Sequence, residues 1–138
     1  YLPHNHEELG VVYTGTHDNN TTLGWYQDLS EDQRAIVRHY LGDSHEPMPG
    51  LLVRTALASV ACMAVIPLQD ILAQDGAHRM NVPGVSGGNW TWRFSWEQLR
   101  DEQRQQLREW IQLYGRAPSS CYWVVTSARS CSRFQTGG

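Results

Sequence analysis

Two short apolar runs, each followed at once by polar side chains, constrain most strongly what this chain can fold into. Residues 9–14 form the first run, which ends at Gly15, and residues 64–68 form the second, which ends at Gln69 and Asp70. Runs of this length, rich in β-branched and aromatic residues, predict buried strands. The long segment between them has a helical pattern, and such crossovers join parallel strands. The sequence therefore predicts an α/β fold containing a βαβ unit.

Capping signals and apolar periodicity predict the helices. Ser30 and Gln33 form a capping box, and Ser95 and Gln98 form another. Residues 51–63 are apolar on nearly every side and predict a buried helix. The predicted helices are therefore a short one at 22–26, one from Ser30 to Gly42, the buried one, and a last one from Ser95 to Gly115.

Polar residues at the end of the first predicted strand form the first candidate site. Gly15 allows a sharp turn, and Thr16, His17 and Asp18 follow it. The carboxyl ends of parallel strands are where barrels and open α/β sheets hold their ligands. A carboxylate beside an imidazole can bind sugar hydroxyls and oppose a developing positive charge. Asp18 is alternatively a helix cap, and His17 is alternatively a buried core histidine.

Composition excludes several classes of function. Fourteen acidic and eleven basic side chains are spread without a basic stripe, which argues against nucleic acid as a partner. No apolar run reaches the ~20 residues that a membrane span needs. The three cysteines do not form a disulfide framework, so we expect a reducing cytosol, with Cys62 as a small buried side chain. The opening Tyr1 suggests a piece of a longer protein.

The first residues contain a weak candidate for a metal site. His4, His6, Glu7 and Glu8 offer the imidazole and carboxylate groups that transition metals accept. No further histidines are placed to complete such a site, and a polar loop beside a pocket is the preferred interpretation.

A long irregular loop over residues 78–90 is the second candidate site, because loops of this length in compact domains are usually functional. Asn81 either lines a cleft or makes an Asx-turn. Trp90 and Trp92 are expected to pack the loop rather than to stack on sugars. Gln69 and Asp70 are expected to cap the next turn.

Five motifs in one order resemble a known family. They are Tyr13-Thr14-Gly15-Thr16-His17-Asp18-Asn19, Ile66-Pro67-Leu68-Gln69-Asp70, Met80-Asn81-Val82-Pro83-Gly84, Gly88-Asn89-Trp90-Thr91-Trp92-Arg93 and Tyr114-Gly115-Arg116. Together they resemble the C-terminal part of a 4-α-glucanotransferase (amylomaltase), of the α-amylase clan of (β/α)₈ barrels. The resemblance implies that residues 1–116 form about the seventh and eighth β/α units of a TIM barrel. Residues 117–138 depart from the family and are expected to be a disordered tail.

The resemblance also implies a chemistry. Such enzymes transfer α-1,4-glucan segments by a retaining double displacement through a covalent glycosyl-enzyme. Asp18 matches the carboxylate that stabilises the transition state, and His17 and Asn81 match residues that bind the sugar. No metal or organic cofactor is implied. The partners are α-1,4-glucans such as maltooligosaccharides, starch and glycogen, and the expected location is the cytoplasm.

The chain departs from the family because the nucleophile and the acid/base belong to earlier strands. We therefore expect the isolated chain to be inactive and poorly folded. Two other functions stay open at this point: a metal-dependent barrel hydrolase using His4, His6, His17 and Asp18, and a non-catalytic α-glucan-binding fragment.

Overall fold

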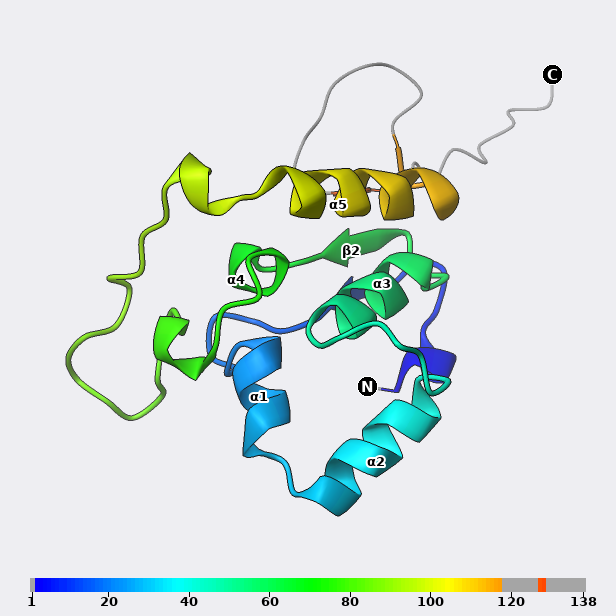
Figure 1. The fold of residues 1–138 in the computed structure, drawn as a ribbon. Helices are drawn as coiled ribbons and strands as arrows, with labels where there is room; N and C mark the ends of the chain where they lie inside the picture. The colour runs from blue at the N-terminus through cyan, green and yellow to red at the C-terminus, as the bar shows by residue number, and fades with distance from the viewer. Residues whose placement is uncertain (1, 118–126, 129–138) are drawn as a thin grey trace, which may run out of the picture.

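A parallel pair of strands organises the fold. The structure, a computed structural model, describes residues 2–117 and 127–128. Strand β1 (Val11–Tyr13) pairs in parallel with β2 (Met63–Val65), and Val12 lies opposite Ala64. Between them in the chain lie α1 (Thr22–Asp28), α2 (Glu31–Tyr40) and α3 (Gly50–Ala58), as Figure 1 shows. The predicted βαβ unit with parallel strands is therefore confirmed.

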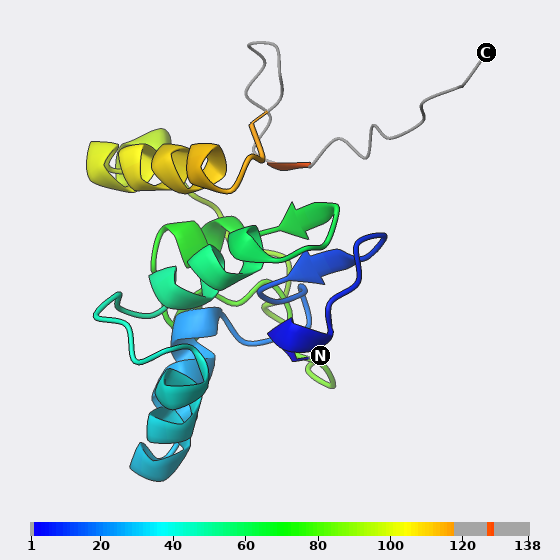
Figure 2. The same ribbon diagram turned by 90° about the vertical axis from the view of Figure 1, so that its right-hand side faces the viewer.

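The remaining elements follow β2. They are α4 (Leu68–Ile71), the 3₁₀ turns η2 (Gly76–His78) and η3 (Trp96–Gln98), α5 (Asp101–Leu113) and β3 (Ser127–Ala128), while η1 (Pro3–Asn5) precedes β1. β3 pairs antiparallel with β2, and the rest of the tail beyond residue 117 lies outside the described residues. In Figures 1 and 2, α3 lies against the strands, α5 lies above them, and α2 projects away from the sheet.

One face of the strand pair forms the core. Val12 and Ala64 point toward α3 and join Val53, Ala56, Leu57 and Ala61 in one buried cluster. Helix α5 packs against this cluster through its apolar stripe, which is Leu107, Trp110 and Ile111, with Tyr114 just beyond the helix. The opposite face is open: Val11, Tyr13 and Met63 are 45%, 51% and 38% exposed. Because side chains alternate along a strand, this second apolar face is the face that α3 does not cover.

Two predicted helix boundaries are wrong. The helix expected over 51–63 ends at Ala58, Ser59 is extended, and Met63 already lies in β2. The last helix is interrupted at Leu99, whose ψ of 94° separates η3 from α5. The Gln98 side chain accepts the Ser95 N–H at 2.9 Å, and Gln103 accepts the Arg100 N–H at 3.1 Å, so the segment starts twice.

Local capping explains where α2 begins. The Ser30 hydroxyl accepts the Gln33 N–H at 3.3 Å, and the Gln33 side chain accepts the Ser30 N–H at 2.9 Å. This reciprocal pair is the capping box that the sequence predicts.

Cys62 is only partly buried, and its thiol donates to the Gly10 carbonyl at 3.4 Å. Cys62 is therefore not the buried side chain that the sequence predicts.

The motif Tyr114-Gly115-Arg116 ties α5 to the end of α3. Gly115 has φ +63°, a left-handed conformation that glycine adopts without strain and that ends α5. Arg116 is fully buried, and its guanidinium donates to the carbonyls of Leu57, Ser59 and Ala61. The Tyr114 hydroxyl accepts from Arg54 Nε at 2.9 Å. The role of this motif is therefore to hold the two helices together.

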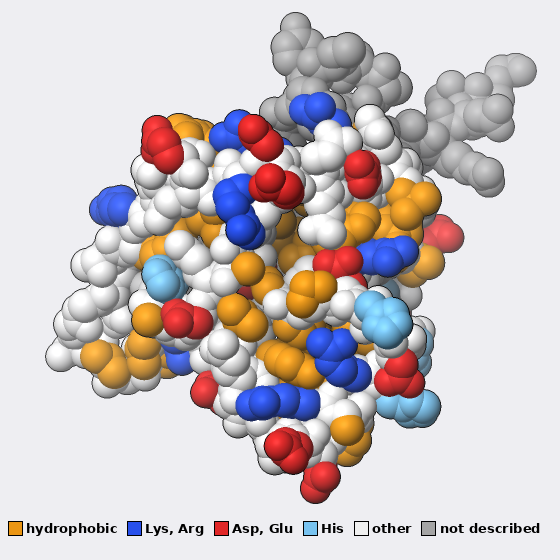
Figure 3. All heavy atoms as spheres, in the orientation of Figure 1, with side chains coloured by type: hydrophobic (Ala, Val, Ile, Leu, Met, Phe, Trp, Pro, Cys, Tyr) orange, Lys and Arg blue, Asp and Glu red, His pale blue; other side chains and the backbone are white. Residues whose placement is uncertain are grey.

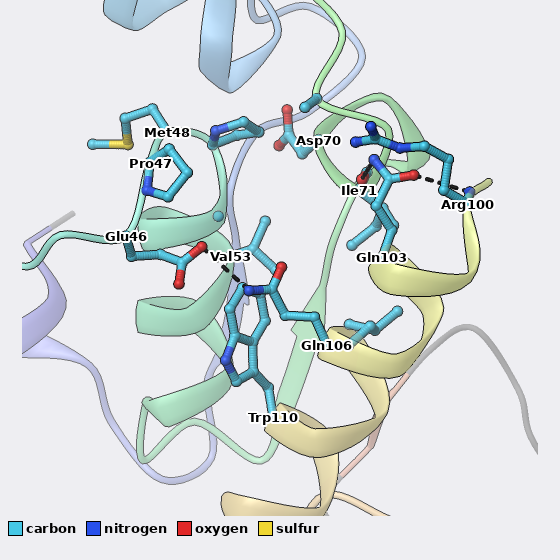
Figure 4. A pocket seen from close by; sticks show the side chains of 14 residues that line it. Glu46, Pro47, Met48, Val53, Asp70, Ile71, Arg100, Gln103, Gln106 and Trp110 are labelled. Atoms are coloured by element: carbon cyan, nitrogen blue, oxygen red, sulfur yellow. Dashed lines mark hydrogen bonds between the residues drawn. The ribbon is translucent and has the colours of Figure 1, made fainter. Parts of the chain in front are cut away.

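A small cavity of about 160 Å³ separates α5 from α4 and the Glu46–Gly50 segment. Figure 4 shows how α5 bridges it: Gln106 donates to Glu46 Oε1 at 3.4 Å, and the Trp110 ring lies beneath this bond. Gln103 Nε2 donates to the Ile71 carbonyl at 3.0 Å. On the face drawn in Figure 3, acidic and basic side chains are interspersed around exposed hydrophobic ones.

Candidate active site at the end of β1

A tight turn after β1 presents the first candidate residues. Asn19 Oδ1 accepts both the backbone N–H and the hydroxyl of Thr16, at 2.8 and 2.9 Å. The Asn19 N–H in turn donates to the Thr16 carbonyl at 3.1 Å. His17 and Asp18 therefore stand at the tip of a closed turn, and their side chains are 54% and 52% exposed. This exposure excludes the interpretation of His17 as a buried core residue.

Asp18 is held through one of its two carboxylate oxygens. Asn81 Nδ2 donates to Asp18 Oδ1 at 2.6 Å, and His17 Nε2 lies 3.4 Å from the same oxygen. No donor among residues 2–117 bonds Asp18 Oδ2. The structure thus brings together the three residues that the sequence singles out, and it leaves one carboxylate oxygen open to a ligand.

The loop that carries Asn81 is fixed by a second asparagine. Asn89 Oδ1 accepts the Val82 N–H at 2.9 Å, and Asn89 Nδ2 donates to the Val85 carbonyl at 2.8 Å. The amide of Asn81 instead reaches across to the turn after β1. Asn89 is therefore the residue that closes the loop locally, and the Asx-turn interpretation of Asn81 is wrong.

Trp90 covers His17. Its φ of +61° is a left-handed conformation, rare for a bulky residue, and its N–H donates to the Met80 carbonyl at 2.8 Å. The rings of Trp90 and His17 have centroids 5.0 Å apart, and Trp90 is 55% exposed. Trp92 is only partly buried, stacks on Phe94 and donates to Gln74 Oε1 at 2.9 Å. Trp92 thus packs the loop as expected, whereas Trp90 forms part of the site.

A cavity of about 510 Å³ opens beside this turn. Its lining includes Tyr13, His17, Gln69, Arg79 and Trp90. Asp18 and Asn81 are not part of that lining, although His17 and Asn19, on either side of Asp18 in the chain, are. A second hollow, of about 680 Å³, runs along the other edge of β1 and is lined in part by Val11, Trp25 and Leu52.

Asp70 fixes the base of the site, a role that sequence reasoning missed. It is only 3% exposed, and its Oδ2 accepts the hydroxyls of Thr14 and Thr22 at 2.6 and 2.7 Å. Its Oδ1 accepts the Thr22 N–H at 2.9 Å, so Asp70 caps α1 rather than the turn that follows Asp70 itself. The prediction that Asp70 caps the next turn is therefore wrong, because the helix that it caps is α1. The sequence does contain a signal for this role: an acidic residue, Asp70, directly follows a predicted strand, and threonines precede a predicted helix elsewhere in the chain.

Gln69 is also buried, and its amide donates to the His78 carbonyl at 3.3 Å. Next to it, Asp75 caps η2 through the Ala77 N–H at 3.1 Å and bonds the His78 ring at 2.9 Å. The hydrogen bond from His78, followed by that from Ala77, lowers the pKa of the Asp75 carboxyl. These contacts tie the start of the long loop to α4 and close η2.

The two histidines of the candidate metal site contact other side chains. His4 Nδ1 lies 2.6 Å from the Tyr40 hydroxyl, and His6 Nδ1 lies 2.7 Å from the Ser59 hydroxyl. Within residues 2–117 and 127–128, no three histidine, cysteine or acidic side chains gather as metal ligands would. In the same residues no helix is long and apolar enough to span a bilayer.

A parallel strand pair, with an acid and an imidazole just after β1 and a loop amide bonded to that acid, defines an α/β protein that presents polar groups at the carboxyl end of β1. Comparison with known proteins is consistent with that class. Residues 1–101 match the family described as 4-alpha-glucanotransferase. The chain therefore belongs to the 4-alpha-glucanotransferase family.

Individual relatives support the same family assignment. The chain is 48% identical over 118 residues to a 4-alpha-glucanotransferase of Synechocystis sp., covering 84% of this chain and 23% of the relative. It is 44% identical over 116 residues to that of Thermus thermophilus, covering 78% and 23%. An amylomaltase from Streptococcus agalactiae in complex with acarbose superposes with a TM-score of 0.81 at 35% identity, covering 85% of this chain and 24% of that one. The chain thus spans about a quarter of the length of these relatives.

Proposed function

We propose that this chain is the C-terminal part of a 4-α-glucanotransferase and supplies about the seventh and eighth β/α units of a (β/α)₈ barrel. Two features of the fold support this. Strands β1 and β2 are parallel and joined by helices, and β1 has an unpaired edge within the described residues, flanked by the hollow of about 680 Å³. The apolar strand face with Val11, Tyr13 and Met63 then becomes the face that the rest of the barrel covers.

Asp18 is, in this proposal, the carboxylate that stabilises the transition state. The observation that carries the assignment is its geometry, with Oδ1 fixed by Asn81 and Oδ2 open, in a family of glucan transferases. In a retaining transfer, positive charge develops on the sugar as the glycosidic bond breaks. A fixed carboxylate near the ring opposes that charge without having to reorganise. The nucleophile and the acid/base come from segments upstream of this chain.

His17 and Asn81 bind the sugar beside Asp18. Asn81 uses one amide hydrogen for Asp18 and keeps its second for a ligand, and the half-exposed His17 lines the cavity. The substrates are α-1,4-glucans such as maltooligosaccharides, starch and glycogen, and neither nucleic acid nor a membrane is a partner. The reaction needs no metal or organic cofactor. We place the enzyme in the cytoplasm, although plant relatives carry the description chloroplastic/amyloplastic.

Incubating the full-length enzyme with maltotriose tests this function. The wild type is expected to form both longer and shorter glucans, and Asp18→Asn is expected to lower the rate by about 10²–10³-fold, the effect of removing one preorganised electrostatic group. Asp43→Asn is the matched control, because Asp43 is a 66% exposed acid whose side chain, among the described residues, bonds only His39. Equal rates for wild type and Asp18→Asn would contradict the role of Asp18.

Experiments on the isolated chain test independently whether it is part of a larger barrel enzyme. Because β1 keeps an unpaired edge and an exposed apolar face, we expect aggregation, binding of a hydrophobic dye and no turnover. Maltodextrin binding without turnover by a well-folded isolated chain would favour a non-catalytic glucan-binding module. The metal-dependent hydrolase finds no support in the described residues, since His4 and His6 contact Tyr40 and Ser59.

A further inference from the structure

A single arginine joins the two segments that meet at Asp18. Arg79 Nη2 donates to the backbone carbonyl of Asp18 at 2.9 Å, and Arg79 Nε donates to the backbone carbonyl of Asn81 at 3.3 Å. The two acceptors lie 63 residues apart in the chain. The guanidinium therefore links the turn after β1 to the loop that carries Asn81.

From this geometry we infer that Arg79 is a positioning residue that sets the orientation of the Asp18 carboxylate. The inference rests on the proposed function of Asp18. The 2.6 Å bond from Asn81 to Asp18 requires the turn and the loop to stay at one spacing. Arg79 fixes that spacing because its planar fork presents donors in a rigid arrangement and binds one carbonyl on each side.

The turn depends on this link because its own contacts are local. Asn19 closes the turn through Thr16 but does not tie it to the loop. Asp18 and His17 are half-exposed, so packing contributes little to their placement. Apart from Arg79, the hydrogen bond and ring contact that join turn and loop within the described residues are the Asn81 amide bond to Asp18 and the Trp90 ring beside His17. Both described side-chain hydrogen bonds of Arg79 go to backbone carbonyls, which is the arrangement of a residue that acts through Asp18.

A matched arginine lies in the same loop. Arg93 Nη1 donates to the carbonyls of Trp90 and Trp92, at 3.2 and 2.7 Å. It therefore stabilises the same loop through backbone carbonyls, as Arg79 does, but none of its described contacts reaches the turn. Comparing Arg79→Met with Arg93→Met separates the link to Asp18 from general support of the loop.

The test uses the full-length enzyme with maltotriose and measures kcat and KM separately. Arg79→Met is expected to lower kcat by about 10- to 100-fold, since small misplacements of a reacting group cost up to about 10²-fold. KM is expected to change little, because the lost effect is confined to the transition state. Arg93→Met is expected to keep both constants within about threefold of wild type, as surface changes usually do.

Further variants keep the inference falsifiable. Arg79→Met combined with Asn81→Ala is expected to cost less than the product of the two single effects, since both changes act on one carboxylate. If Arg79→Met fails to fold, Arg79→Lys replaces it: the lysine ammonium lacks the fork, so an intermediate kcat is expected, and a wild-type kcat overturns the inference. A raised KM with unchanged kcat, or equal effects of the Arg79 and Arg93 variants, also overturns it. Absence of glucan transfer by the wild type would instead contradict the proposed function.

Discussion

The carboxylate of Asp70 accepts both the backbone N–H and the hydroxyl of Thr22, at 2.9 and 2.7 Å, and so fixes the start of α1 against α4, the helix that follows β2. The same Oδ2 also accepts the Thr14 hydroxyl from the residue after β1. One buried acid thus connects both strands to the helix that follows the site turn.

Replacing Asp70 is expected to destabilise the protein. In Asp70→Ala, the Thr22 N–H and two hydroxyls lose their buried acceptor, which should lower the free energy of unfolding by about 2–4 kcal/mol. Urea denaturation of the full-length enzyme measures this. Asp101→Ala is the control, since the Asp101 side chain is 95% exposed, and it should change stability by no more than about 0.5 kcal/mol. Equal effects of the two variants would show that the buried contacts contribute no stability.

A methyl group at Gly24 should destabilise α1 although alanine is the better helix former. An added Cβ would lie 2.6 Å from both the Gly76 nitrogen and Asn20 Oδ1. The helix propensity of alanine favours Gly24→Ala by about 1 kcal/mol. Overpacking against backbone costs about 1–3 kcal/mol, so the net effect should be a loss. Gly87→Ala meets nothing within 4 Å, and its thermal midpoint should match the wild type; a raised midpoint for Gly24→Ala would refute the clash.

Removing the Arg116 guanidinium should loosen α5 from α3. Arg116→Met leaves the carbonyls of Leu57, Ser59 and Ala61 without this donor, with an expected loss of about 2–4 kcal/mol. Arg104→Met is the control, since within the described part of the chain the Arg104 side chain bonds only Trp96 and Asp101, both through exposed hydrogen bonds. Hydrogen exchange of α3 amides measures the effect, and unchanged protection in Arg116→Met would refute it.

Placing a second acid beside Asp18 should make activity depend on pH. In Asn81→Asp, two carboxyl groups would face each other where the amide now donates at 2.6 Å. Repulsion between like charges raises the pKa of one member of such a pair, so the pair shares a proton as the pH falls. The rate of Asn81→Asp relative to wild type should therefore rise between pH 7 and about 5. Asn81→Ala lacks the new carboxyl, and its rate relative to wild type should stay flat over that range.

Much of the fold follows from local signals. The alternation of Val11, Val12 and Tyr13 places one side chain inside and two outside, as in a strand covered on one face. The Ser30 capping box and the turn at Gly15 are also local, since their partners lie three or four residues away. His17 and Asp18 could be placed at the site for the same reason: they directly follow a strand.

The contacts that define the site geometry are not local. Asn81 meets Asp18 across 63 residues, and Thr22 meets Asp70 across 48. Hydrophobic periodicity carries no information on which loop amide reaches which carboxylate. The sequence therefore leaves two roles open for Asn81 and does not single out Arg79. The end of α3 was misplaced for a similar reason, because the donor that bonds its carbonyls, Arg116, comes from beyond α5.

The long separation between Arg116 and α3 affects how the chain matures on the ribosome. Ser59 is synthesised 57 residues before the arginine that bonds its carbonyl. At the usual rates of elongation the two are made roughly 3 to 11 s apart. During that interval β2 is also synthesised, but the arginine that bonds the carbonyls of Leu57, Ser59 and Ala61 does not yet exist. Docking of α5 is therefore the closing step of this segment, and a ribosome stalled ahead of Arg116 would hold a nascent chain prone to misfolding.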